Sequence, residues 1–113
     1  MNYRVLKTER QFKDTTGYDR ATFELLLQDF EQTYEAINGQ GYESYIEKSV
    51  TEPPKLKTLG DVLFFVLFQM KNDLIFGSLG AVFGMSGGAA HNNFERFSTL
   101  LAQTLEKKSD AQT

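Results

Sequence analysis

The sequence predicts an all-α domain of four to five helices that includes a helix-turn-helix corner. Apolar residues recur at helical spacing in two long segments, residues 19–37 and 58–71. Glycine and proline clusters separate these segments, and two shorter helical patterns flank Gly84. With 113 residues, 41% of them hydrophobic and ten of them Phe, the chain is long enough for a modest core. We therefore expect one compact domain.

The first long helix is predicted over residues 19–37, with Asp19 or Thr22 as its N-cap. Its apolar stripe consists of Phe23, Leu26, Leu27, Phe30, Tyr34 and Ile37. Before it, residues 10–12 are predicted to form a short helical turn that packs Phe12 onto the core. Residues 15–17 are expected to interrupt the helical structure between this turn and the long helix.

Residues 38–57 are predicted to be the least regular part of the chain. Asn38-Gly39-Gln40-Gly41 favours a turn that ends the first long helix. A short strand or hairpin is expected at residues 42–50. Pro53-Pro54 predicts an extended connector, because proline lacks the backbone donor and restrains the residue before it. Residues 1–54 thus form an N-terminal helical segment with an irregular connector.

The second long helix is predicted from Thr58 to Lys71, with Asp61 completing a capping box. It is apolar on most sides, which predicts the central helix of the domain. A polar break follows at residues 71–73. At the other end of the chain, residues 109–113 are predicted to fray.

Residues 76–97 predict the corner itself. A short helix runs to Phe83 and ends at Gly84, which suits a positive φ. Gly80 allows a close approach of the two helices, Met85 fills the space between them, and Ser86 caps a second helix that extends to about residue 106. Ala90, Phe94 and Phe97 lie on the buried face of this second helix.

Such a corner in DNA-binding proteins places its second helix in the major groove. Residues 55–108 are therefore interpreted as a helix-turn-helix DNA-binding region. The candidate DNA-contacting residues are Ser86, Gly87, Ala89, His91, Asn92, Arg96 and Lys71. Asn and His can hydrogen-bond to base edges, and the helix N-terminus can hold a phosphate. Arg96 and Lys71 can contact the DNA backbone.

Each candidate residue also has a purely structural interpretation. His91 and Asn92 are equally typical of a solvated helix face, and Ser86 of a simple cap. Arg96 fits an ion pair with a glutamate, and Lys71 fits a solvated loop. The glycines at 87 and 88 lower helix propensity, which indicates close backbone approach to DNA or to the partner helix.

Composition excludes several kinds of site. The absence of Cys excludes disulfides and thiol chemistry, and a single His does not support a His-based metal site, so no cofactor is expected. No leader or membrane-spanning segment is visible, which predicts a cytoplasmic protein. The net charge of -3 is unevenly spread: residues 1–54 carry six basic and ten acidic side chains, and residues 55–113 carry six and five.

Several stretches resemble the helix-turn-helix domain that precedes the catalytic domain of DDE-type transposases of bacterial insertion sequences. They are Thr16–Phe23, Lys55–Phe64, Leu74–Ser86 and Leu100-Leu101. The resemblance implies binding of double-stranded DNA at the element's terminal inverted repeats during transposition and recombination. Sparse basic charge on the second helix predicts modest affinity of a single copy, so a homodimer or a catalytic transposase subunit is expected as partner. The catalytic carboxylates of that family have no equivalent here, so the chain itself is not expected to be an enzyme.

A protein-interaction or dimerisation module on the same scaffold is the alternative. The acidic N-terminal half and the small residues at 87–90 favour it. An enzyme of another kind finds no support, because neither a nucleophile–base pair nor a metal-ligand cluster is visible in the sequence.

Overall fold

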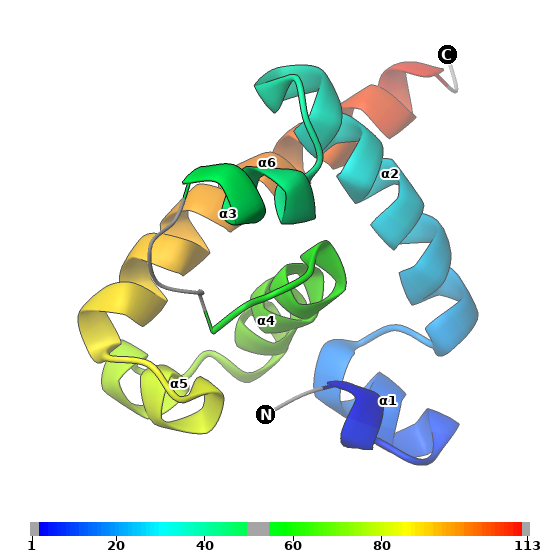
Figure 1. Cartoon of the computed structure of the whole chain (residues 1–113). Coiled ribbons are helices and arrows are strands. Elements are labelled where there is room, and N and C mark those ends of the chain that lie inside the picture. Colours follow the sequence, from blue (N-terminus) through cyan, green and yellow to red (C-terminus); the bar gives the residue numbers. More distant parts are fainter. Residues whose placement is uncertain (1–2, 50–54, 112–113) are drawn as a thin grey trace.

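The computed structural model describes residues 3–49 and 55–111, and these are helical apart from short connections (Figure 1). A short 3-10 helix at Tyr3–Val5 precedes six α-helices in the described residues. These are α1 (Glu9–Thr16), α2 (Arg20–Asn38), α3 (Tyr42–Ser49), α4 (Leu59–Asn72), α5 (Phe76–Phe83) and α6 (Gly87–Ala111). The predicted all-α class is confirmed, but the described residues form six α-helices where four to five were predicted. None of these helices is both long and apolar enough to cross a membrane.

Helix α4 lies in the middle of the molecule and packs against α1, α2 and α6 (Figure 1). Between Leu59 and Gln69 every residue except Asp61 is buried. The prediction of a central helix is confirmed, and its cause is the run of apolar side chains on all faces. The ring of Phe64 contacts those of Tyr3, Phe12, Phe68 and Phe83, with centroids 5.8–6.4 Å apart.

The helix ends follow the predicted capping residues. The amide of Asp61 donates to Thr58 Oγ1 at 3.1 Å, and the amide of Thr58 donates to Asp61 Oδ2 at 3.3 Å, which completes the capping box of α4. Asp19 caps α2, because its Oδ1 accepts from the Thr22 amide at 2.7 Å. Gly39 ends that helix at φ +75°. Local side-chain chemistry alone therefore sets these boundaries.

The segment around residues 42–50 differs from its prediction. The expected strand or hairpin is wrong, since Tyr42–Ser49 forms α3. The Tyr42 side chain is buried, and its hydroxyl donates to the Leu56 carbonyl at 2.7 Å. Docking of this one ring onto the core stabilises a helix that local propensity leaves undecided. Pro53-Pro54, the predicted extended connector, lies outside the described residues.

Three helix limits and the burial of one side chain also differ from the prediction. Helix α1 is a full helix that includes Thr15 and Thr16, and it ends only at Gly17, whose φ is +83°. Ile37 is 54% exposed, so it does not join the buried stripe of α2. Helix α4 continues through Asn72, and Asp73 is its C-cap. Helix α6 continues to Ala111, so the predicted fraying from residue 109 is wrong at the backbone through residue 111, and residues 112–113 lie outside the described part.

Candidate nucleic-acid interface

Helices α5 and α6 are joined by a three-residue turn. Gly84 ends α5 at φ +75°, and the Met85 amide donates to the Gly80 carbonyl at 2.8 Å. Ser86 Oγ accepts from the Ala89 amide at 3.1 Å, which caps α6 as predicted. Met85 is half-buried against the core and receives a 3.6 Å contact from Asn93 Nδ2 at its sulfur. Gly84 and Ser86 therefore have the roles that the sequence predicts, as the end of α5 and the cap of α6.

Glycines allow the backbones at this corner to touch. A Cβ on Gly80 would overlap the Met85 carbonyl oxygen and lie 2.9 Å from the Ser86 carbonyl oxygen. A Cβ on Gly87 would lie 3.3 Å from the Gly77 Cα. The close approach predicted at Gly80 is confirmed, and the turn backbone is what it approaches. Gly88, in contrast, has open space around it.

The first two turns of α6 bring five of the seven candidate residues together, namely Ser86, Gly87, Ala89, His91 and Asn92. Ser86, His91 and Asn92 are exposed, whereas Gly87 and Ala89 are half-buried. The Asn92 side chain makes no hydrogen bond to any described residue. It is therefore available to a partner.

His91 is partly engaged within the domain. Its ring packs edge-on against Phe76, with centroids 4.8 Å apart. Its Nε2 atom lies 3.5 Å from Glu95 Oε1, one helical turn further along. These contacts direct the imidazole toward α5, so a DNA contact by His91 competes with a neighbouring carboxylate.

Arg96 and Lys71 do not join this cluster. The Arg96 guanidinium lies 4.9 Å from the Phe97 ring centroid, and its side chain turns toward α2. The predicted alternative of an ion pair between Arg96 and a glutamate is not seen among the described residues. Lys71 is exposed near the end of α4, and its Cδ passes beside Gly17 in the turn between α1 and α2. The structure thus assigns the two candidate cations to other parts of the molecule.

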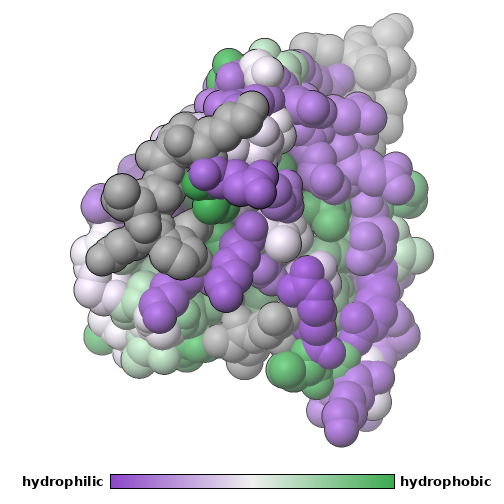
Figure 2. Space-filling model, in the orientation of Figure 1, coloured by the Kyte–Doolittle hydropathy of each residue, from purple (hydrophilic) through white to green (hydrophobic). Residues whose placement is uncertain are grey.

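The acidic side chains gather on α2 and α3. Burial raises the pKa of Glu31, and the carboxylates of Glu43, Glu24 and Glu35 raise it further. Figure 2 shows hydrophilic residues along α2, whereas the surface over α5 is paler and more apolar. Because like charges repel, DNA is disfavoured on the α2 face, and the first turns of α6 lie on the opposite side in Figure 1.

Two features of the structure were not predicted from the sequence. The hydroxyl of Tyr34 is buried without a hydrogen-bond partner in the described part of the chain, beside a hollow between α2 and α6. The presence of a tyrosine in an apolar stripe was the available signal, since its hydroxyl needs a partner. The second feature is a groove of about 520 Å³ where α4 meets α5. Its rim includes Met70 and Ile75, which are 59% and 76% exposed.

Comparison with known proteins adds no relative: no protein-family model, curated protein or solved structure matches the chain. Within residues 3–49 and 55–111, no group of three or more His, Asp or Glu side chains is arranged to hold a metal ion.

Proposed function

We propose that this protein binds duplex DNA through the first two turns of α6, as the end-recognition module of a transposase-related protein. The supporting observation is the exposed start of α6, which the glycine-packed α5–α6 corner holds in a fixed orientation. A long helix whose first turns face solvent has the shape that the major groove accepts.

In this proposal, Asn92 is the principal base-reading residue. Its exposed amide can donate and accept simultaneously, which matches the N6 and N7 atoms of adenine. The free amides at the start of α6 and the Ser86 hydroxyl hold an adjacent phosphate, assisted by the helix dipole. His91 contributes a weaker contact, because Glu95 lies beside it.

Affinity of a single copy is expected to be modest. Arg96 faces α2 and Lys71 lies beside the α1–α2 turn, so few cations accompany the first turns of α6. Neutralised phosphates supply much of the affinity of DNA-binding proteins. A second copy or a catalytic transposase subunit would therefore raise the affinity through linked binding.

Fluorescence anisotropy of the full chain with short duplexes tests the proposal. One duplex carries the DNA that flanks the coding region and the other a scrambled sequence, each at about 50 and about 200 mM salt. We expect tighter, salt-sensitive binding to the flanking DNA, and a loss of about tenfold in affinity for Asn92→Ala. Gln103→Ala, which removes another exposed amide later in α6, is the matched control and should bind normally. Absence of binding at low salt would contradict the proposal.

A protein-interaction module is the second candidate function. The groove between α4 and α5 favours it, because Met70 and Ile75 expose apolar surface around it. Under this alternative the chain self-associates through the groove and shows no salt-sensitive DNA affinity. Sedimentation of Ile75→Lys would then report a monomer. Leu25→Lys, which changes an equally apolar exposed residue on α2, should leave the association intact.

A further inference from the structure

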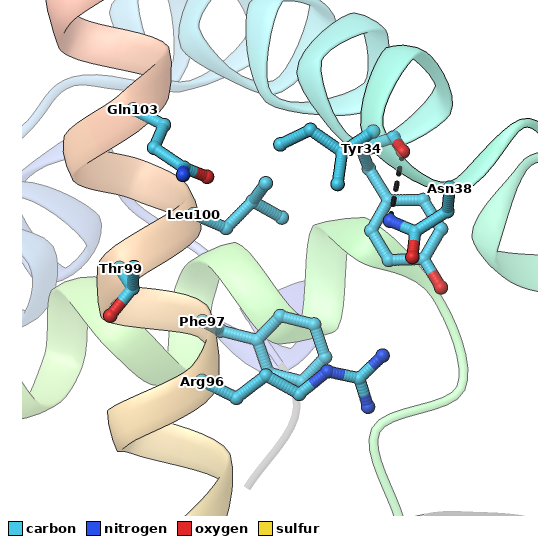
Figure 3. A pocket seen from close by; sticks show the side chains of 8 residues that line it. Tyr34, Asn38, Arg96, Phe97, Thr99, Leu100 and Gln103 are labelled. Carbon is cyan, nitrogen blue, oxygen red and sulfur yellow. Dashed lines mark hydrogen bonds between the residues drawn. The ribbon is translucent and has the colours of Figure 1, made fainter.

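A hollow of about 150 Å³ lies between the end of α2 and the middle of α6 (Figure 3). We call it the α2–α6 hollow and define it by Tyr34, Ile37, Arg96, Phe97 and Leu100, with polar side chains at its rim. Its α6 residues lie beyond the first two turns, which are the turns proposed to contact DNA. A cavity of about this volume accommodates a benzene-sized molecule.

Two hydrogen-bond donors in the hollow, the Tyr34 hydroxyl and the Arg96 guanidinium, lack an acceptor in the described part of the chain. Tyr34 is 1% exposed, and its hydroxyl makes no hydrogen bond to any described residue. Arg96 has no carboxylate partner in the described part of the chain; its guanidinium stacks on Phe97 and lies close enough to the Tyr34 hydroxyl to lower the pKa of that group. Figure 3 shows that Arg96 from α6 and Tyr34 from α2 extend toward one another. A buried donor without an acceptor is unfavourable, so an external acceptor would stabilise this arrangement.

The charge of the hollow selects an anion. Burial raises the pKa of Tyr34, and the positive charge of Arg96 opposes part of that rise. The hydroxyl therefore stays protonated at neutral pH and can donate a hydrogen bond. A guanidinium presents two parallel N–H groups that match the two oxygens of a carboxylate.

The rest of the hollow is apolar. Leu100 forms one wall, and Ile37, which is 54% exposed, lies at its edge. An exposed isoleucine beside an exposed arginine suits a ligand with one charged end and one apolar end. A phosphate or sulfate ion would leave this apolar wall uncovered.

We propose that the α2–α6 hollow binds a small monocarboxylate with a benzene-sized apolar body. The carboxylate pairs with the Arg96 guanidinium and accepts a hydrogen bond from the Tyr34 hydroxyl, and the body covers Ile37 and Leu100. The exposed Arg96 side chain moves outward to meet the anion, which opens the Tyr34 hydroxyl to the ligand. This site is separate from the proposed DNA contact and does not depend on it.

Benzoate is the probe that tests this site, with benzyl alcohol as a neutral ligand of similar size. Titration of the full chain, followed by NMR chemical shifts, should place benzoate between α2 and α6 and show much weaker binding of benzyl alcohol. Arg96→Gln should weaken benzoate binding about tenfold, because it removes the charge-assisted pair. Lys107→Gln removes a charge from an exposed position on the same helix and should leave the affinity unchanged.

Tyr34→Phe separates a binding role from a structural one. It keeps the buried ring but removes a hydroxyl whose proton has no acceptor in the described residues, so the melting temperature should stay equal or rise. Benzoate affinity should nevertheless fall severalfold. Equal affinity for benzoate and benzyl alcohol in the unmodified protein would overturn the proposal even if a variant fails to fold. Absence of benzoate-induced shifts, or unchanged benzoate affinity of folded Arg96→Gln, would overturn it as well.

Discussion

The α1–α2 and α5–α6 corners use the same turn chemistry but different packing. In each, an eight-residue helix ends at a glycine with positive φ, Gly17 or Gly84, and a capping residue two positions later starts a long helix. Asp19 caps α2, and Ser86 caps α6. The sequences of the two turns, Gly-Tyr-Asp and Gly-Met-Ser, share only the glycine and a small polar cap.

Side chains hold the α1–α2 corner together. The rings of Phe12 and Phe23 meet edge to face at 5.1 Å, and Arg20 lies 4.7 Å from the Phe12 centroid. The Arg20 Nε atom also pairs with Glu9 Oε1 at 3.3 Å. Helix α1 contains no glycine, so its backbone keeps a side chain's distance from α2.

Backbone contact holds the α5–α6 corner together. Helix α5 contains Gly77 and Gly80, and α6 begins with Gly87 at the contact. Packing through the inner backbone leaves the outer face of the first turns of α6 uncovered. One turn type can therefore either bury its second helix or leave the start of that helix exposed, depending on the side chains next to the turn.

The largest effect is expected from Phe12→Ala in the side-chain corner. Removing this fully buried ring leaves a cavity among Tyr3, Phe23 and Phe64, so the free energy of unfolding should fall by about 4 kcal/mol. Urea denaturation measures the change. Leu25→Ala, at a side chain that is 59% exposed, is the control and should change little. A similar loss for both variants would show that ring packing does not define this corner.

Gly80→Ala is the equivalent test of the backbone corner. The added methyl group would overlap the Met85 carbonyl, and we expect a loss of about 3 kcal/mol in unfolding free energy. Gly88→Ala is the matched control, because it adds the same methyl group in open space within α6. It should stabilise the helix by about 1 kcal/mol, since alanine has the higher helix propensity. Tolerance of Gly80→Ala would mean that the two backbones do not touch.

Tyr42 lies in neither corner and tests whether they unfold together. Burial raises its pKa to about 12 from the ordinary value of 10.0. The unfolded chain therefore ionises first as the pH rises, so this contribution is complete below pH 10 and lost as the pH approaches 12. We expect the ionisation of Tyr42 to lower the free energy of unfolding by about 2 kcal/mol.

The alkaline experiment follows unfolding by circular dichroism and tyrosinate absorbance across that pH range. Tyr42→Phe should flatten the pH dependence, although Tyr3 and Tyr34, whose pKa values are also raised, retain part of it. A single transition indicates one cooperative unit that includes both corners. Two separate transitions would show that the two corners unfold independently.

The smallest effects come from the two caps, which differ in their response to pH. Ser86→Ala should cost about 1 kcal/mol at any pH, because a hydroxyl cap does not titrate. Hydrogen bonds from Thr22 lower the pKa of Asp19 below its ordinary value of 3.8. Its stabilisation is therefore present above that value and is lost as the pH falls through the folded-state pKa.

Melting temperatures of Asp19→Asn and the parent protein, measured from neutral to acidic pH, isolate this contribution. The parent should show the steeper decline in acid. Parallel curves would indicate that the Asp19 charge has no part in capping α2.

Local chemistry made much of the fold predictable. The capping pairs at Thr58–Asp61 and Ser86–Ala89 and the glycine at position 84 act within a few residues, so they can be recognised in the sequence. The same holds for α4, because a helix that is apolar on all faces is buried on all sides only at the centre of the domain. The capping box of α1, formed by Thr8 and Gln11, is equally local, although the predicted helical turn at residues 10–12 does not include it.

The all-α class, most helix limits and the close contact at Gly80 follow from the sequence, because each depends on backbone conformation or on neighbouring residues. The helical state of residues 42–49 depends instead on tertiary packing, since the Tyr42 hydroxyl bonds the Leu56 carbonyl, which lies 14 positions further along the chain. Tertiary packing also decided where the cations lie. Arg96 faces Tyr34, and Lys71 lies beside Gly17, because the packing of distant helices sets which side of each helix remains accessible.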